Sequence, residues 1–208
     1  ASFQLKSLVK DFGDVRVIHG VDLQVDDGEF VVFVGPSGCG KSTLLNVITG
    51  IDKPDSGQVT VHGQDILRMG TDALARWRGR NVGIIFQFFQ LLPTLTVAEN
   101  VFLGTQPITR LGTVDWARMV RESPEHLAGL GIDVDPRTRI GELPIGLQQL
   151  IEIARVLFSG ARILILDEPT AVLTPQETEA LFEVLRRLRA QGTTILLITH
   201  KLKEVMAL

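Results

Sequence analysis

The sequence predicts an α/β fold with a mixed, mostly parallel sheet, antiparallel strands at the N-terminus and an inserted helical lobe. The main observation is a series of short apolar runs suited to strands buried on both faces, at Phe30–Val34, Val82–Phe86, Ile163–Leu166 and Thr194–Ile198. Between the last two runs, Pro175–Gln191 has the spacing of an amphipathic helix. Strand, helix and strand at these lengths are typical of a parallel sheet.

The N-terminal segment has a different pattern. Residues 3–9 and 15–25 alternate between apolar and polar side chains, which predicts two antiparallel strands joined by a turn at Gly13 and Asp14.

The middle of the chain predicts helices and no convincing strand. Helical spacing covers residues 115–130 and 147–159. We therefore assign residues 89–157 to a helical lobe, and residues 1–88 and 158–208 to the α/β core.

Composition excludes several classes of function. The chain has 208 residues, 45% of them hydrophobic, and a net charge of −3, which gives no general attraction to nucleic acid or anionic lipid. Its basic cluster, Arg76–Arg80, is better interpreted as a solvated helix end. One cysteine, Cys39, excludes an internal disulfide. No signal pattern or membrane-spanning run is present, so we expect any role at a membrane to require a partner. The absent initiator Met and the end at Leu208 suggest a trimmed or engineered chain.

A glycine-rich loop carries the main chemical signal. "GPSGCGKS", Gly35–Ser42, fits the pattern G-x-x-x-x-G-K-[ST] and lies between a predicted buried strand and a predicted helix over Lys41–Thr49. Glycines let backbone N–H groups turn toward phosphate oxygens, Lys41 can reach the β- and γ-phosphates, and the Ser42 hydroxyl can bind Mg²⁺. The alternative is a strand-to-helix turn that binds nothing. The predicted nucleotide-binding residues are Gly35, Pro36, Ser37, Gly38, Cys39, Gly40, Lys41, Ser42 and, for the α-phosphate, Thr43.

A second signal is "ILILDEP" at residues 163–169. Asp167 follows four aliphatic residues and so falls at the carboxyl edge of a parallel sheet, where ligands of such sheets bind. We expect Asp167 to hold Mg²⁺ and Glu168 to orient the water that attacks the γ-phosphate. The alternative is a strand that ends in two acids before a proline turn. Beside a complete phosphate loop, the two motifs together predict an ATP-hydrolysing site.

Two single residues complete the predicted site. Gln87 ends the strand "VGIIFQ" and could bridge Mg²⁺ and the attacking water, and His200 ends "TILLITH" and could touch the γ-phosphate. Each would more often be a satisfied polar residue at a strand end. The other histidines, His19, His62 and His126, are interpreted as surface or turn residues, and no His/Cys cluster has metal-ligand spacing.

Taken in their order along the chain, the motifs resemble the nucleotide-binding domain of ATP-binding cassette (ABC) transporters. The resemblance spans nearly the whole chain and implies a P-loop NTPase core. "GPSGCGKST" resembles the Walker A loop, "IIFQ" the Q-loop, "ILILDEP" the Walker B strand with its catalytic Glu, and "LLITH" the switch histidine. Phe12 falls where the family places an aromatic residue that stacks on adenine.

The segment "LPIGL" at residues 143–147 occupies the position of the family signature, "LSGGQ". On its own, Pro144 with Gly146 could be simple helix-opening chemistry or a helix N-terminus that grips an anion. The resemblance implies that Gly146 binds the γ-phosphate held by the opposite subunit. Pro144 and Ile145 depart from the family pattern, and Thr174 stands where an Asp usually reaches across the dimer.

The resemblance changes along the chain. The first part is similar to carbohydrate importers of the maltose type, "RNVGIIFQFFQ" to lipoprotein-release and macrolide exporters, and the later motifs to simple-sugar and nucleoside importers. A chimera and an unusual natural member both account for this mosaic.

The resemblance implies an ATPase that uses ATP and Mg²⁺, forms a head-to-tail dimer with itself or another ABC domain, and energises transmembrane permease subunits. Its expected location is cytoplasmic, on the inner face of the cell membrane, and no nucleic-acid partner is expected. The alternatives are a non-transport ABC ATPase, and a chimeric or truncated domain that binds nucleotide without driving transport.

Overall fold

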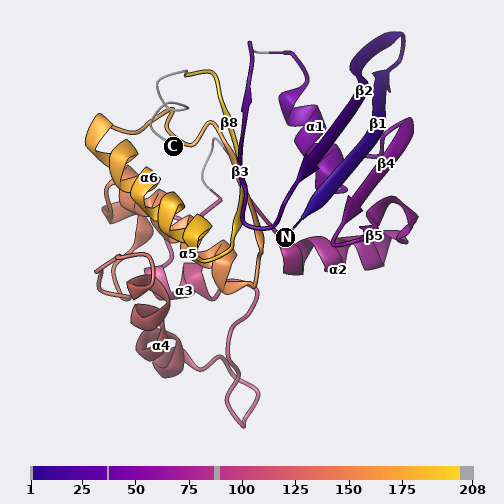
Figure 1. The fold of residues 1–208 in the computed structure, drawn as a ribbon. Helices are drawn as coiled ribbons and strands as arrows, with labels where there is room; N and C mark the ends of the chain where they lie inside the picture. Colours follow the sequence, from indigo (N-terminus) through magenta and orange to yellow (C-terminus); the bar gives the residue numbers. More distant parts are fainter. Residues whose placement is uncertain (1, 37, 87–89, 202–208) are drawn as a thin grey trace.

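The computed structural model describes residues 2–36, 38–86 and 90–201. Two separate sheets form its framework, one antiparallel and one parallel (Figure 1). This arrangement confirms the predicted α/β fold with antiparallel strands at the N-terminus. The two strand directions belong to different sheets, since the described strands of the core sheet all run parallel to one another.

The antiparallel sheet has the strand order β2-β1-β4-β5. Strands β1 (Phe3–Phe12) and β2 (Val15–Val25) are the predicted hairpin, which pairs from Phe3 with Val25 to Phe12 with Val15. The sequence prediction missed β4 (Ser56–Val61) and β5 (Gln64–Asp65). Strand β4 buries only Val59 and Val61, so its apolar alternation is too short to stand out.

The parallel sheet has the order β3-β8-β7-β6 and carries the phosphate loop. Strands β6 (Val82–Ile85), β7 (Ile163–Asp167) and β8 (Thr194–Thr199) match the predicted runs. Both faces of β3 (Phe30–Val34) pack against buried clusters, as predicted, but the burial is partial: its residues are half-buried and Val34 is exposed. Within the described residues β3 pairs with β8 alone, which places it at the end of the sheet.

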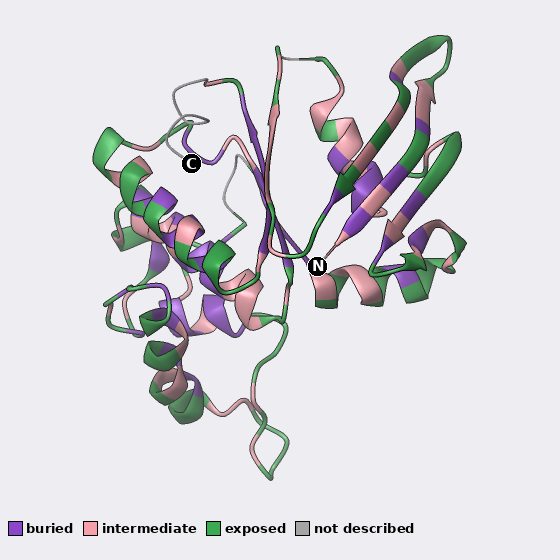
Figure 2. Cartoon of the chain, in the orientation of Figure 1, coloured by how far each residue is buried: buried purple, intermediate pink, exposed green. Residues whose placement is uncertain are grey.

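One face of the parallel sheet packs toward the antiparallel sheet. Helix α1 (Lys41–Ile48) lies between the two sheets, and its Leu45, Val47 and Ile48 join a buried cluster with both (Figures 1 and 2). Helix α2 (Thr71–Asn81) packs on this cluster through Leu74. The basic cluster falls in the last turns of α2, which confirms its interpretation as a helix end.

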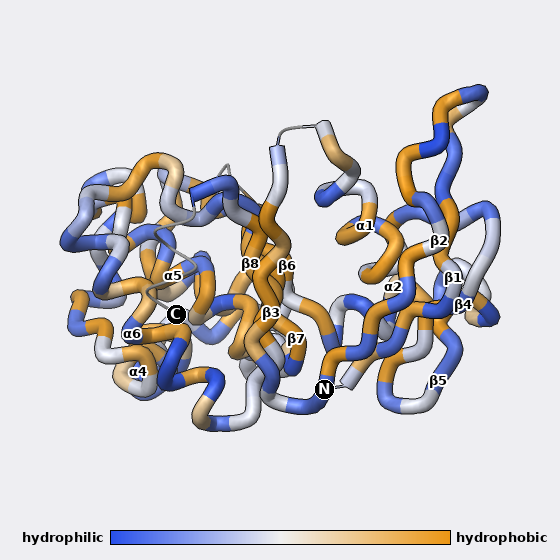
Figure 3. Tube along the Cα trace, turned by 45° about the horizontal axis from the view of Figure 1, so that its top comes forward, coloured by the Kyte–Doolittle hydropathy of each residue, from blue (hydrophilic) through white to orange (hydrophobic). Residues whose placement is uncertain are grey.

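Helices cover the other face of the parallel sheet. They are α3 (Val97–Val101), α4 (Trp116–Ala128), α5 (Ile145–Phe158) and α6 (Pro175–Ala190). Their apolar sides join the sheet in a second buried cluster, and the parallel strands form the apolar centre of the molecule (Figure 3). Helices α3 and α4 fall within the predicted lobe, and α5 ends one residue beyond it. The exact boundaries of the lobe at 89–157 stay a prediction. Among the described helices, none is long and apolar enough to cross a membrane.

Candidate nucleotide-binding site

The phosphate loop connects β3 to α1, as its motif predicts. Gly38 and Gly40 have φ angles of 81° and 91°, and Gly40 is the N-cap of α1. A side chain at position 40 would also approach Val17 to 3.0 Å. Glycine is therefore required there on two grounds, and the loop delivers the backbone to the positive end of a helix.

The Lys41 ammonium group lies folded against the loop that precedes it. Its Nζ donates hydrogen bonds to the carbonyl oxygens of Gly35 (2.8 Å) and Pro36 (2.7 Å), and it lies 3.4 Å from the Cys39 Sγ. These contacts hold a positive charge at the mouth of the loop. Ser37 lies outside the described residues.

Asp167 ends β7 directly across from the start of α1. Its carboxylate and the Ser42 side chain both line the cavity beside the loop and interact electrostatically. Burial raises the pKa of Asp167, and the neighbouring Glu168 charge raises it further, while Lys41 and the Ser42 side chain lower it. A divalent cation offsets both raising effects, so this hydroxyl and carboxylate fit Mg²⁺, which binds one or two protein oxygens together with phosphate and water. Among described residues there is no group of three or more His, Cys, Asp or Glu with metal-binding geometry, and such a magnesium site does not need one.

Glu168 has an unusual backbone conformation for its residue type. Its φ is +48°, a strained value for a side chain other than glycine, and its N–H donates to the Ile198 carbonyl at 2.9 Å. The Glu168 Oε1 lies 3.1 Å from the Nδ1 of His200. An ionised carboxylate can only accept, so we assign the proton in this contact to Nδ1. Two of the predicted catalytic residues are therefore in direct contact.

Eight of the predicted site residues line one cavity of about 270 Å³. Others that the structure describes do not line it, among them Gly35, Pro36, Cys39 and His200. Phe12 lies at its rim, 52% exposed, with the Lys10 ammonium 5.1 Å from the ring centroid. Gln87 lies outside the described residues. The cavity is lined by Phe12, Val17, Gly38, Gly40, Lys41, Ser42, Thr43, Asp167, Glu168 and Ile198.

Gly146 does not line this cavity; it lies in the first turn of α5. Pro144 is the N-cap and provides no side-chain hydrogen bond. The Gly146 N–H instead donates to Glu177 Oε1 of α6 at 3.1 Å. Glu177 also accepts from the backbone and hydroxyl of Thr174, and these bonds, with that of Gly146, lower its pKa. Sequence analysis missed Glu177, although Thr174 and Glu177 have the spacing of a capping box.

Two more functional candidates lie in the middle of α5. Glu152 is fully buried and its Oε1 accepts from the Gln90 N–H at 2.9 Å. Arg155 donates to the Gln90 carbonyl at 3.0 Å. Burial raises the pKa of Glu152, while the Gln90 N–H and Arg155 lower it. The helix that begins at the signature position therefore also holds the backbone three residues after Gln87.

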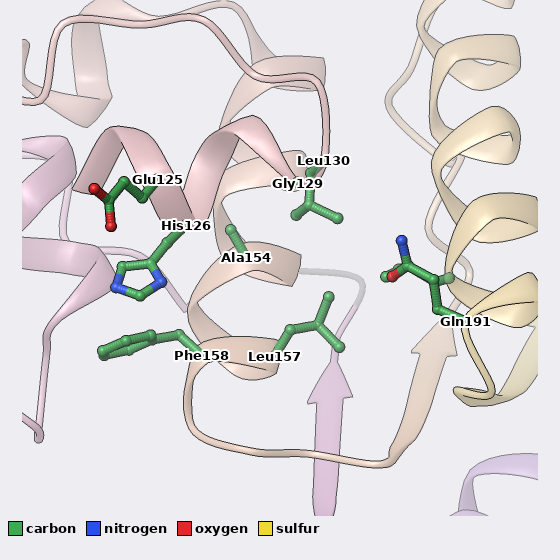
Figure 4. A pocket seen from close by; sticks show the side chains of 9 residues that line it. Glu125, His126, Gly129, Leu130, Ala154, Leu157, Phe158 and Gln191 are labelled. Carbon is green, nitrogen blue, oxygen red and sulfur yellow. The ribbon is translucent and has the colours of Figure 1, made fainter. Parts of the chain in front are cut away.

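A second cavity, of about 290 Å³, lies between α4, α5 and α6 (Figure 4). The interpretation of His126 as a surface or turn residue was wrong: its ring packs 4.2 Å from that of Phe158 and 5.7 Å from that of Phe102. His19 and His62 are exposed, as expected. None of the predicted site residues lines this second cavity.

Comparison with known proteins decides the family. A sequence profile described as "ABC transporter" matches residues 18–171. The chain belongs to the ABC transporter family. The ABC domain is 44% identical to the ribose import ATP-binding protein RbsA 1 of Streptomyces avermitilis and 40% identical to RbsA of Geobacillus kaustophilus, across 99% and 98% of its own length. It spans 38% and 41% of those relatives, about two fifths of their length.

Solved ABC structures share the fold. A dimeric ATP-binding cassette, MJ0796, bound to ADP and Pi, has a TM-score of 0.81 and 30% identity, covering 99% of this ABC domain and 90% of that chain. CbiO1 of Clostridium perfringens, part of the ABC transporter complex cbiONQ, has a TM-score of 0.85 and 26% identity, covering 98% and 80%. The resemblance predicted from the motifs is confirmed.

Proposed function

We propose that this ABC domain binds Mg-ATP at the cavity beside the phosphate loop, hydrolyses it and thereby energises a membrane transporter. The observation that carries the proposal is the convergence of Lys41, Ser42, Asp167 and Glu168 on one cavity, with His200 against Glu168. A phosphate cradle, a cation site and a general base are the parts that phosphoryl transfer to water requires.

Each residue has a role that follows from its position. The loop N–H groups and the Lys41 ammonium bind the phosphates, and Phe12 stacks on the adenine at the cavity rim. Ser42 and Asp167, with Gln87, hold Mg²⁺, which supplies charge neutralisation on the phosphate oxygens. Glu168 accepts a proton from the attacking water and orients it. His200 holds the Glu168 carboxylate through Nδ1.

The second half of each ATP site comes from another ABC domain, in a head-to-tail dimer with itself or with a related chain. The Gly146 N–H and the positive end of α5 would contact the γ-phosphate bound by the partner. The dimeric state of the MJ0796 cassette supports this arrangement.

The proposed partners are transmembrane permease subunits, and the proposed location is the inner face of the cell membrane. The ribose import names of its relatives support a simple sugar as the transported substrate. The permease would contact the segment after Gln87 and the start of the helical lobe, around residues 88–103.

Steady-state phosphate release tests the proposal. The wild type should hydrolyse Mg-ATP, and Glu168→Gln should lower turnover about 10²- to 10⁴-fold, the usual contribution of a positioned base. Glu179→Gln is the matched control, because Glu179 is exposed on α6. Equal turnover in wild type and Glu168→Gln contradicts the assignment.

A second candidate is a domain that binds nucleotide without hydrolysing it. Pro144 and Ile145 favour it, because the signature lacks a side-chain cap and one glycine. This alternative is supported if calorimetry shows Mg-ATP binding while no phosphate is released, even when a permease is present.

A further inference from the structure

The start of α5 already holds an anion supplied by the chain itself. Oε1 of Glu177, on α6, accepts from the Gly146 N–H at 3.1 Å. A side chain at position 146 would come within 2.7 Å of the Glu177 side chain. The carboxylate therefore lies directly against the backbone donor on which the proposed γ-phosphate contact depends.

The carboxylate is fixed in this place from its other side. Oε2 of Glu177 accepts from the Thr174 N–H at 2.9 Å and from its hydroxyl at 2.8 Å. These bonds and that of Gly146 lower the pKa of Glu177, which keeps it negative at neutral pH. One carboxylate thus caps two helices, its own α6 and the neighbouring α5.

We infer that Glu177 is a positioning residue of the γ-phosphate clamp, which holds the Gly146 donor in the monomer and yields it to ATP when the dimer closes. The inference rests on the proposed function. One N–H cannot donate a full-strength hydrogen bond to a carboxylate and to a phosphate oxygen at the same time. Two anions at one helix end also repel each other. Dimer closure therefore exchanges Glu177 for the γ-phosphate, and the exchange weakens the ATP-bound dimer.

The fold contains a matched control for the capping role. Thr96 and Glu99 form the same capping box at the start of α3. The Thr96 N–H and hydroxyl both lie 2.6 Å from Glu99 Oε2, and the Glu99 N–H lies 3.3 Å from the Thr96 hydroxyl. Glu99 has no such contact with Gly146, so its substitution tests capping alone.

The test measures dimerisation by sedimentation equilibrium with Mg-ATP, in a Glu168→Gln background that retains ATP. Adding Glu177→Gln should lower the dimer dissociation constant about 5-fold at each of two sites, and so about 25-fold in total. Its melting temperature without nucleotide should fall, because the cap is weakened. Adding Glu99→Gln should lower the melting temperature and leave the dimer constant unchanged. Glu177→Asp retains the charge but is one methylene shorter, so it should also tighten the dimer.

The inference is overturned if Glu177→Gln and Glu177→Asp weaken the dimer or leave it unchanged, including the case in which all variants stay monomeric. Calorimetry of Mg-ATP binding to the same proteins separates this failure from that of the proposed function. If ATP binds and the dimer does not tighten, only the role of Glu177 fails. If ATP does not bind, the proposed function fails as well.

Discussion

At the phosphate loop, the groups proposed to contact ATP come from one continuous stretch, Gly35–Thr43, whereas at the start of α5 the donor Gly146 and its partner Glu177 are 31 residues apart. The loop geometry follows from glycines at positive φ and from the start of a helix, both of which are local properties. The α5 terminus acquires its partner from the packing of α6. A local motif thus sets the conformation of the phosphate loop, whereas tertiary structure sets the contact at the start of α5.

The largest effect should come from restoring the family signature at α5. Pro144→Ser, Ile145→Gly and Leu147→Gln together, in a Glu168→Gln background, add a side-chain hydrogen bond at each of two sites. At about 1.5–3 kcal/mol per bond, the ATP-bound dimer should tighten roughly 10- to 150-fold at each site. Size-exclusion chromatography with Mg-ATP measures the change, and identical profiles for both proteins would mean that this segment is not the clamp.

On the loop side, Lys41→Ala should weaken Mg-ATP binding by roughly 10- to 150-fold, the value of one charge-assisted hydrogen bond. Isothermal titration calorimetry measures the affinity, and Lys6→Ala, at an exposed lysine on β1, is the control. Because the loop binds ATP within one chain, this loss of affinity should be the same whether the protein is monomeric or dimeric. Equal affinity in wild type and Lys41→Ala contradicts the assignment of the loop.

The same contrast separates the site residues that the sequence predicts from those that it does not. The phosphate loop, Asp167 and Glu168 were predicted and line one cavity, and the predicted His200 contacts Glu168. Their motifs place each residue at a strand end of one parallel sheet, so the topology brings them together. The role of Glu177 required the position of α6 relative to α5, which no local pattern contains. The same holds for Glu152, whose apolar neighbours predict only that α5 is buried.

The smallest effect concerns Glu152. Its pKa in the folded chain is raised above the ordinary 4.5, so the folded state binds more protons than the unfolded state above pH 4.5. The associated stability is present below that pH and is lost as pH rises through the folded pKa. Its Oε2 also has no hydrogen-bond partner among the described atoms. Glu152→Gln should therefore raise the free energy of unfolding at pH 8 by about 1 kcal/mol, with a smaller gain near pH 4.5.

Urea denaturation at the two pH values measures this difference. The control is Glu125→Gln, since Glu125 is exposed on α4. A gain that is the same at both pH values, or a loss at pH 8, would show that the buried charge does not govern the stability of this contact with Gln90.

The central claim is that each ATP lies between the phosphate loop of one chain and the α5 terminus of another, and the lone cysteine allows a direct test. Cys39 is exposed in the loop and Ile145 is 43% exposed beside Gly146. In a Glu168→Gln, Ile145→Cys variant, mild oxidation with Mg-ATP should join two chains through Cys39 and position 145. Without nucleotide, or with Ile145 retained, the cross-linked dimer should be absent. Cross-linking that is independent of ATP, or that occurs equally through Cys39 alone, would contradict the head-to-tail arrangement.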